Sequence, residues 1–377
     1  MKILHVCESV IGGPASYFEE MLPFQVARFS GENVILLGPE DHRAHVRADI
    51  GCVFETYRRA GRDPRSLLAL AAAIRRAVTR HDPDIVHLHS SFAGAIGRLV
   101  VRAMRHRARI VYCAHCWSFD RVPYTAAARL WTAIERVLAR ATDAIVNLSP
   151  HENPLLLEAG FPARKIRLVV TGVRDIPPER RPALAARAPG RPLRLLFLGR
   201  FDAQKGADLL MRDFTGIAPE RAVLTLVGGK VVDGVDFEIP PGMTHLGWVA
   251  RSTLPELLAG FDAVIMPSRW EGMSIWAIEI LRSGRPLLGS NRGVFPHIID
   301  GVNGAVIDID RPGFMDRAIR VLEASDLSLM GAAARATYER LFDPARMNRE
   351  LIEIYESLLE RPRPVAEGRA AISGTRA

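Results

Sequence analysis

The segment DAVIMPSRWEGMSIWAIEILRSGRPLL, residues 262–288, contains a complete strand–loop–helix–strand unit. It begins with the short apolar run DAVIMPS, which has the length of a buried parallel strand. Apolar residues at Ile275, Ile278 and Leu281 then recur with helical spacing, so we expect a helix over Ile275–Ser283. A second apolar run, RPLLGSN, follows it. Strands that alternate with helices in this way indicate a parallel sheet with helices on both faces.

The same alternation continues through most of the 377-residue chain. In the first half we expect strands at KILHVC, ENVILLG, DIVHLHS, RIVYCAH and DAIVNLS. In the second half we expect them at LRLLFLG, AVLTLVGG, MTHLGW, DAVIMPS, RPLLGSN and GAVIDI. Between the halves, residues 174–192 contain five prolines and no periodicity, which is typical of a linker. The predicted fold class is therefore α/β, with two Rossmann-like doubly wound domains that face each other across a cleft.

These patterns give the expected domain boundaries. We expect an N-terminal Rossmann-like domain over residues 1–175, a linker over residues 176–192 and a second domain over residues 193–344. A C-terminal helix over residues 345–360 is expected to pack back toward the N-terminal domain. The tail over residues 361–377 is rich in Arg, Pro and Gly, which predicts disorder.

The composition is that of a soluble globular protein with a substantial core, since 48% of the residues are hydrophobic and 24% are charged. No apolar run reaches the roughly 18 residues needed to span a bilayer. The N-terminus, MKILHVCESV, has the pattern of a first strand and lacks that of a signal peptide. We therefore expect a cytoplasmic protein.

The formal net charge is +8, and most of it lies before Arg180. One dense basic block is RAMRHRAR, residues 102–109. A basic first half suits an anionic lipid surface or an anionic substrate, although a solvated helix end in an Arg-rich protein explains the block equally well. No helix-turn-helix, zinc finger or aromatic–basic platform accompanies the charge, so nucleic acid is not an expected partner.

Residues 111–120, VYCAHCWSFD, place His115 between Cys113 and Cys116. A redox pair or half of a zinc site are the two alternatives that this spacing raises. Zinc requires four ligands at recognisable spacing, and no second Cys/His pair of that kind appears. Cys113 also ends an apolar strand, where a small thiol commonly serves as a packing residue. We therefore expect no metal site and treat His115 as the functional residue.

Two other loops follow predicted strands. In GRFDAQKG, Arg200 leaves the strand end and Lys205 lies five positions later, at the start of a helix. A fork-shaped guanidinium and a point-charge ammonium at one corner suit a diphosphate, and lysine is rare in this chain. In ESVIGGPASYFEE, Gly12 and Gly13 permit a tight turn that aims amide groups at an anionic or sugar ligand.

The opening segment contains two carboxylates in the pattern E-x7-E, Glu271 in the loop and Glu279 in the expected helix. Eight residues of helix rise about 12 Å, roughly the reach from a sugar ring across a diphosphate to a ribose. Gly272 frees the backbone, and the N–H groups near Met273 and Ser274 open the helix without intrahelical partners, which suits an anion. Glu279 lies among apolar residues, where its carboxylate needs hydrogen-bond donors such as ribose hydroxyls.

The chain resembles the GT-B glycosyltransferases of the large retaining group called family 4, or glycosyl transferases group 1. The resemblance covers nearly the whole length and includes the order of the motifs. The matching residues are Gly12-Gly13 after the first strand, His115 after a central strand, Gly199, Arg200 and Lys205 of G-R-x4-K, and Glu271, Gly272, Ser274 and Glu279 of E-G-x-S…E. It implies an acceptor-side N-terminal domain and a C-terminal domain that binds a nucleotide-sugar.

The resemblance also implies roles for individual residues. Arg200 and Lys205 would hold the donor diphosphate, assisted by the backbone at Met273 and Ser274. Glu271 would bind donor-sugar hydroxyls, Glu279 the ribose and Val249 the base, while His115 would reach across the cleft to the sugar. Two departures from the family pattern are Arg174 in place of an aspartate and His297 in place of a glutamate. The second departure leaves the donor sugar open.

The implied activity is transfer of a sugar from a nucleoside-diphosphate sugar to a glycan or lipid-linked glycan, with retained anomeric configuration and without a metal cofactor. The basic first domain, together with Trp117, Phe119 and Tyr124 near the site, favours a glycolipid acceptor and peripheral contact with the inner face of an anionic plasma membrane, as in bacterial surface polysaccharide synthesis. A sugar-nucleotide epimerase, a phosphorylase and a non-catalytic sugar-nucleotide-binding protein are the alternatives. The motifs fit the epimerase poorly, and a phosphorylase normally has a far longer chain.

Overall fold

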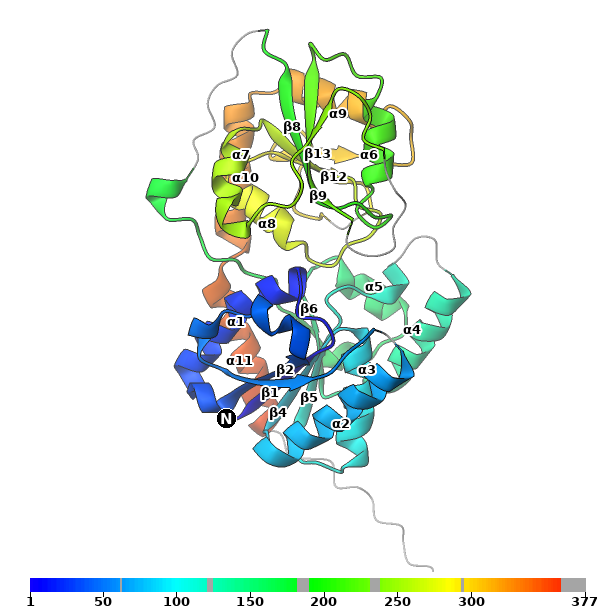
Figure 1. The fold of residues 1–377 in the computed structure, drawn as a ribbon, viewed down its shortest axis with the longest axis vertical. Helices are drawn as coiled ribbons and strands as arrows, with labels where there is room; N and C mark the ends of the chain where they lie inside the picture. The colour runs from blue at the N-terminus through cyan, green and yellow to red at the C-terminus, as the bar shows by residue number, and fades with distance from the viewer. Residues whose placement is uncertain (62, 121–124, 182–189, 231–237, 293–294, 361–377) are drawn as a thin grey trace, which may run out of the picture.

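The protein consists of two α/β domains stacked end to end (Figure 1). The computed structural model describes all residues except 62, 121–124, 182–189, 231–237, 293–294 and 361–377. The predicted disordered tail, residues 361–377, and the middle of the predicted linker therefore lie outside the described residues. Among the described residues, no helix is long and apolar enough to cross a bilayer.

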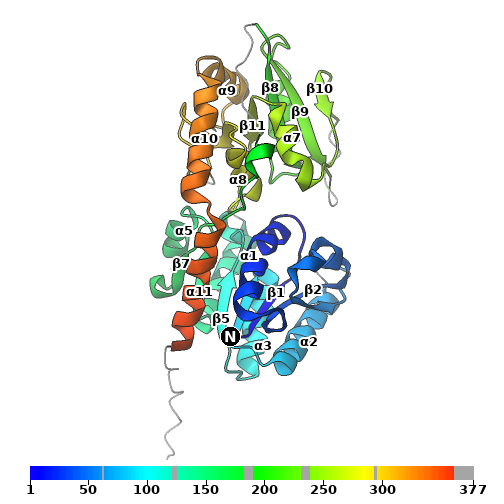
Figure 2. The ribbon, with the colours of Figure 1, turned by 90° about the vertical axis from the view of Figure 1, so that its left-hand side faces the viewer.

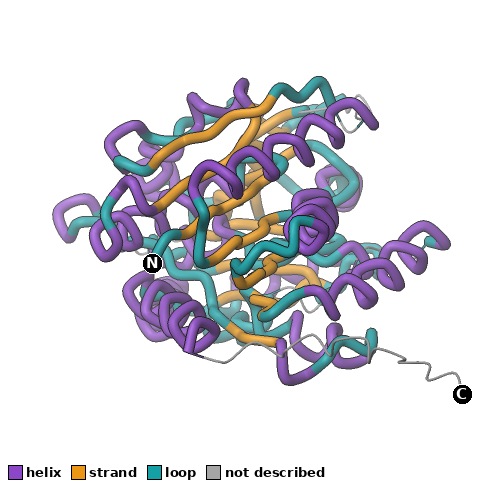
Figure 3. Tube along the Cα trace, turned by 90° about the horizontal axis from the view of Figure 1, so that it is seen from below, coloured by secondary structure: helices purple, strands orange, loops and turns teal. Residues whose placement is uncertain are grey.

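The first domain contains a seven-stranded parallel sheet with the order β3-β2-β1-β4-β5-β6-β7. Its strands are β1 (Ile3–Cys7), β2 (Val34–Pro39), β3 (Val53–Tyr57), β4 (Ile85–His89), β5 (Arg109–Cys113), β6 (Ala144–Asn147) and β7 (Ile166–Leu168). Helices α1 (Gly13–Phe29), α2 (Pro64–His81), α3 (Ser91–Ala103), α4 (Ala126–Leu138) and α5 (Glu152–Glu158) lie between them. Seen from below, the strands form a continuous layer with helices on both sides (Figure 3).

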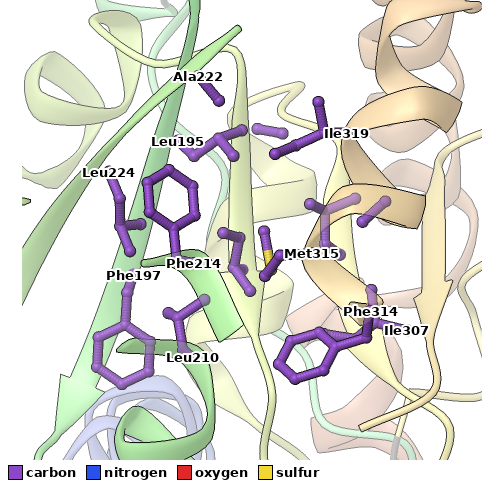
Figure 4. Close-up of a cluster of buried hydrophobic side chains, with 14 of the residues drawn as sticks. Leu195, Phe197, Leu210, Phe214, Ala222, Leu224, Ile307, Phe314, Met315 and Ile319 are labelled. Carbon is purple, nitrogen blue, oxygen red and sulfur yellow. The ribbon is translucent and has the colours of Figure 1, made fainter. Parts of the chain in front are cut away.

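The second domain contains a six-stranded parallel sheet with the order β10-β9-β8-β11-β12-β13. Its strands are β8 (Leu193–Arg200), β9 (Ala222–Gly229), β10 (Met243–His245), β11 (Ala263–Met266), β12 (Leu287–Ser290) and β13 (Gly304–Ile307). Its helices are α6 (Ala207–Phe214), α7 (Leu254–Ala259), α8 (Ile275–Arg282), α9 (Phe314–Glu323) and α10 (Leu327–Leu341). Figure 4 shows one of its cores, in which Phe197 of β8, Phe214 of α6 and Met315 of α9 pack together.

These two sheets confirm the predicted fold class of two doubly wound domains. The eleven strands expected from the sequence all form. Two further strands, β3 and β7, were not expected. Both lie at edges of the first sheet, where β3 is mostly half-buried and β7 has only three residues. Neither therefore has the fully apolar run by which a central parallel strand is recognised.

Each sheet reverses its strand order at one place, and this place determines where loops gather. In the first sheet β1 lies between β2 and β4, and in the second β8 lies between β9 and β11. Such a place is called a topological switch point. Loops that leave its two sides diverge and open a crevice at the carboxyl ends of the strands, where ligands bind in folds of this type. The Gly12-Gly13 turn follows β1, and the Arg200 loop follows β8.

The chain crosses between the domains twice, and the two crossings touch. The Val173 N–H donates to the Phe342 carbonyl oxygen at 3.0 Å. A Cβ at Gly172 would lie 2.4 Å from Pro344 Cα, so a side chain does not fit there. Arg174, where the family pattern has an aspartate, donates from its backbone N–H and its Nε to Glu20 Oε2 of α1, each at 3.0 Å.

The last helix, α11 (Pro344–Glu360), begins at the second crossing and packs on the first domain (Figure 2). Its residues Met347, Leu351 and Tyr355 are buried in the same apolar cluster as Ile3 and Val111 of the first sheet. The Tyr355 hydroxyl also lies 2.6 Å from His87 Nδ1 of β4. The C-terminal helix thus completes the N-terminal domain.

We predict that Leu351→Ala destabilises the protein by about 2–5 kcal/mol, because the substitution leaves a cavity beneath a fully buried helix face. The matched control is Leu359→Ala on the same helix, where the leucine is 42% exposed, and it should change stability by less than about 0.5 kcal/mol. Thermal or urea unfolding followed by circular dichroism measures both. Equal effects of the two substitutions would contradict the placement of α11.

Candidate functional site

Loops from the two sides of the second domain's switch point are joined by an ion pair. The Lys205 ammonium binds Glu271 Oε1, to which the Ser268 hydroxyl also donates at 3.0 Å. The backbone reinforces the pairing, since the Arg269 N–H donates to the Gln204 carbonyl at 2.8 Å. The lysine and the carboxylate come from loops 66 residues apart. The structure thus brings two predicted site residues into direct contact.

Arg200 lies at the same corner, at the carboxyl end of β8. Its Nη2 donates to Gln204 Oε1 at 2.8 Å and lies 3.1 Å from Asp202 Oδ2. The guanidinium is partly exposed, whereas the Lys205 ammonium is largely buried. Both cations therefore have protein partners that an incoming anion would replace.

Gly206 shapes this corner, because it caps α6 in the left-handed conformation with φ 69°. A Cβ at this position would lie 2.1 Å from the Pro267 carbonyl oxygen. A glycine is therefore required both for the backbone angle and for the close approach of the two loops. The approach in turn keeps Lys205 beside the loop that contains Glu271.

The N-terminus of α8 faces the same loop. Ser274 is the N-cap residue, but its side chain does not cap the helix. Its buried hydroxyl oxygen has no hydrogen-bond partner among the described residues. The first backbone N–H groups of a helix lack intrahelical acceptors and carry a partial positive charge. Met273, one residue earlier, packs against apolar clusters of both domains.

Glu279 lies on α8 and is 1% exposed. The Arg251 Nε donates to its Oε1 at 2.5 Å, and Arg282 lies 4.0 Å away. The Oε2 atom has no hydrogen-bond partner among the described residues. Burial raises the pKa of Glu279, against the lowering effects of Arg251 and Arg282. This carboxylate has an unused acceptor, as a ribose-binding residue would.

Arg251 also connects the domains. It binds Glu19 Oε2 through Nη1 and lies 3.3 Å from Glu20 Oε1 through Nη2. Both glutamates belong to α1 of the first domain. Arg251 follows Val249 by two residues, so its bond to Glu279 brings the predicted base-binding stretch toward α8.

His115 follows β5 and has a left-handed backbone, with φ 62°. Its Nε2 lies 2.9 Å from His89 Nδ1, and its ring lies edge-on to Tyr17 of α1 with centroids 5.1 Å apart. Burial lowers the pKa of His115 to about 4, so the ring is neutral at pH 7. Because α1 starts at Gly13, the contact with Tyr17 also links His115 to the Gly12-Gly13 turn. A Cβ at either glycine would meet no atom within 4 Å, so the space above this turn is open.

Neither Cys113 nor Cys116 forms a disulfide bond. Cys113 is 1% exposed and packs in the first domain's core, as the sequence predicts for a packing residue. The fold also brings His89 to these residues, which the sequence spacing did not reveal. The side-chain atoms of His89, Cys113 and His115 that could bind a metal ion lie within 4.8 Å of one another.

The two domains touch at the centre of this region. A Cβ at Gly272 would lie 2.0 Å from the His115 carbonyl oxygen and 3.3 Å from Cys116 Cα. Gly272 therefore allows the Glu271 loop to reach the backbone of His115. The predicted residues of both domains are thus brought to one place.

His297, in contrast, lies elsewhere. Its ring packs edge-on against Phe342 at the domain crossing, with centroids 5.0 Å apart. Burial lowers its pKa to about 4. The residue that departs from the family pattern at this position thus packs at the crossing.

Sequence reasoning missed Arg251, Ser268 and His89. Arg251 and Ser268 belong to no motif, and only the fold shows their contacts with Glu279 and Glu271. His89 had a usable indication, since the strand DIVHLHS contains two histidines on one face and ends at the switch point.

Comparisons with known proteins agree with this fold. Residues 11–175 match the family model Glycosyltransferase Family 4, and residues 192–324 match the model Glycosyl transferases group 1. An uncharacterized 41.2 kDa protein in the cps region of Klebsiella pneumoniae is 26% identical over 95% of this chain and 100% of its own length. UDP-Gal:alpha-D-GlcNAc-diphosphoundecaprenol alpha-1,3-galactosyltransferase of Escherichia coli is 22% identical over 73% of this chain and 74% of its own.

Among solved structures, Anabaena HepE in complex with UDP has a similar fold. The TM-score is 0.74 with 17% identity, over 95% of this chain and 100% of HepE. HepE has also been solved in complex with UDP-glucose.

We predict that Gly272→Ala destabilises the contact between the domains by about 1–3 kcal/mol, because the new methyl group overlaps the His115 carbonyl. The midpoint of thermal unfolding should fall. Gly216→Ala is the matched control, since a Cβ there meets no atom within 4 Å. If Gly272→Ala behaved like this control, the observed approach of the two loops would be refuted.

Proposed function

We propose a sugar-transfer activity for this chain, which belongs to the group 1 glycosyltransferases with the GT-B fold. The enzyme moves a sugar from a nucleoside-diphosphate sugar to a glycan or lipid-linked glycan acceptor and retains the anomeric configuration. The observation that carries this proposal is the Lys205–Glu271 ion pair beside the N-terminus of α8, opposite the His115 backbone.

The donor diphosphate binds between Arg200, Lys205 and the first turn of α8. During transfer the bond between the sugar and the diphosphate breaks, and negative charge grows on the leaving phosphate. Two fixed cations and the helix N-terminus stabilise this charge without further reorganisation, an effect that is commonly worth several kcal/mol. The protein therefore supplies the positive charge itself.

Neighbouring residues bind the rest of the donor. Glu271 accepts hydrogen bonds from the donor sugar once the diphosphate has taken over the Lys205 ammonium. The unpartnered Oε2 of Glu279 accepts from the ribose, and the Val249 stretch contacts the base. Gly12 and Gly13 leave open space for the sugar and the acceptor beside His115.

The relatives support the substrate class and the pathway. The E. coli relative is named for a UDP-galactose donor and a diphosphoundecaprenol acceptor, and the Klebsiella relative is encoded in a cps region. By analogy, the donor is a UDP-sugar or a similar nucleotide-sugar, and the acceptor is a lipid-linked glycan of a bacterial surface polysaccharide.

We predict that Lys205→Ala and Glu279→Gln each weaken donor binding at least tenfold, since each removes a charged partner of the nucleotide. Thermal shift and calorimetry with UDP-, GDP- and dTDP-sugars measure the effect. The matched controls are Arg320→Ala and Glu339→Gln, which alter exposed ion pairs in the same domain. Unchanged binding in both site variants would contradict the proposed donor site.

Product analysis after incubation with the same donors, with and without acceptor, separates transfer from its alternatives. An epimerase would convert the donor sugar without acceptor, and a binding protein would show neither hydrolysis nor transfer.

The acceptor side presents a surface that suits a membrane. On α4 the exposed residues Ala126, Leu130, Ala133 and Val137 form one apolar stripe at helical spacing. Leu130 is 65% exposed and Val137 is 56% exposed. Exposed arginines flank the stripe at positions 129, 136 and 140. An apolar stripe with arginine flanks is the pattern of a helix that lies in the interface of an anionic bilayer.

We predict that the protein floats with phosphatidylglycerol-containing vesicles and that the double variant Leu130→Asp/Val137→Asp floats at least tenfold less. Leu329→Asp is the control, because this leucine is 69% exposed on α10 of the other domain. If the wild-type protein stays in the soluble fraction, the proposed membrane contact is contradicted. This result would have no bearing on the proposed donor site.

A further inference from the structure

We propose that His89, His5 and Gln25 are positioning residues that hold His115 in one tautomer, with the proton on Nε2 and the acceptor lone pair on Nδ1. This inference rests on the proposed function, since it makes His115 Nδ1 an acceptor for a hydroxyl of the bound sugar.

The four side chains form one hydrogen-bonded row. His115 Nε2 lies 2.9 Å from His89 Nδ1, and His89 Nε2 lies 3.1 Å from His5 Nδ1. The row ends where His5 Nε2 lies 2.7 Å from Gln25 Oε1. His5 and His89 lie on β1 and β4, the two strands that flank the switch point, and Gln25 lies on α1.

The last residue of the row determines its polarity. An amide oxygen accepts only, so His5 must donate from Nε2 and accept at Nδ1. His89 then donates from Nε2 and accepts at Nδ1, and His115 donates from Nε2. Because a neutral imidazole has one N–H, the His115 Nδ1 is left as an acceptor.

The surroundings keep each ring neutral. His5, His89 and Gln25 have no exposed surface, whereas His115 is partly exposed and forms the accessible end of the row. Burial lowers the pKa of His5 to about 4 and that of His89 well below its usual value. Tyr17, Tyr355, His87 and Cys113 line the row from α1, α11, β4 and β5, and burial keeps all four uncharged as well. Reversing the row would require moving three protons together along buried side chains.

The consequence concerns specificity. With a lone pair at Nδ1, His115 recognises a hydroxyl donor, and it does not donate a proton to the leaving phosphate. A sugar that lacks this hydroxyl leaves the lone pair unpaired and is disfavoured. The row therefore sets what His115 recognises, although only His115 reaches the ligand.

The test is long-range ¹H–¹⁵N correlation on protein labelled at histidine, which distinguishes protonated from unprotonated ring nitrogens. In ligand-free wild-type protein we expect His115 Nε2 protonated and Nδ1 unprotonated. Gln25→Met removes the strong acceptor and should give mixed tautomers, whereas Gln25→Glu keeps an acceptor and should restore the wild-type state. His89→Asn provides a second variant if Gln25→Met fails to fold, and it too should mix the tautomers.

Kinetics supply the second readout. Gln25→Met should lower kcat/KM about tenfold for the natural donor, the equivalent of one hydrogen bond. The same substitution should lower kcat/KM much less for a donor analogue that lacks the recognised hydroxyl. A proton on Nδ1 of wild-type His115 would overturn the proposal, as would an unchanged tautomer in both Gln25→Met and His89→Asn. So would stoichiometric uptake of Zn²⁺ by His89, Cys113 and His115, because a metal ion would replace the shared protons.

The tautomer is measured without substrate. If the tautomer is as expected and no sugar is transferred, the proposed function fails while the row stands. If sugar is transferred but the proton of His115 is on Nδ1, the proposed role of the row is wrong and the proposed function is unaffected.

Discussion

The close approach of Gly272 to the His115 carbonyl is the constraint on which the rest of the site depends. Each domain has a switch point where loops diverge, but neither crevice alone brings together all the predicted residues. Gly272 lets the Glu271 loop of one domain reach the loop after β5 of the other. Because the contact is made by backbone, its geometry does not depend on side-chain rotamers. The cations, the α8 N-terminus and His115 thereby share one site.

Charge within the site is balanced by protein groups. Lys205 pairs with Glu271, Arg200 lies beside Asp202, and Glu279 accepts from Arg251. An unpartnered buried ion would cost several kcal/mol, and each of these charges has a protein partner. A ligand that binds one of these charged groups must therefore replace that partner. Arg251 also forms ion pairs with Glu19 and Glu20 of α1, so these charge contacts reach the first domain.

Much of the fold was readable from the sequence because both sheets are parallel and covered on both faces. Central strands of this kind are continuous apolar runs, as in DAVIMPS, and the eleven predicted strands include every central strand together with the edge strands β10 and β13. Edge strands such as Val53–Tyr57 are half-buried and lack that pattern. Lys205, Glu271 and Glu279 could be predicted as candidate site residues, since they stand at spacings set by one loop and one helix. Arg251, His89 and Gln25 were missed because their contacts join segments far apart in the chain, and no local spacing records such contacts.

The helix α11 has a consequence for how this protein can be divided. Its apolar face lies in the core formed by β1 and β5, so the N-terminal half of the chain does not contain all of the lobe it builds. A fragment that ends after the first crossing would lack α11 and would expose the apolar surface that this helix covers. Chimeras that exchange the C-terminal domain with a relative's must therefore keep the native terminal helix together with its own amino-terminal partner.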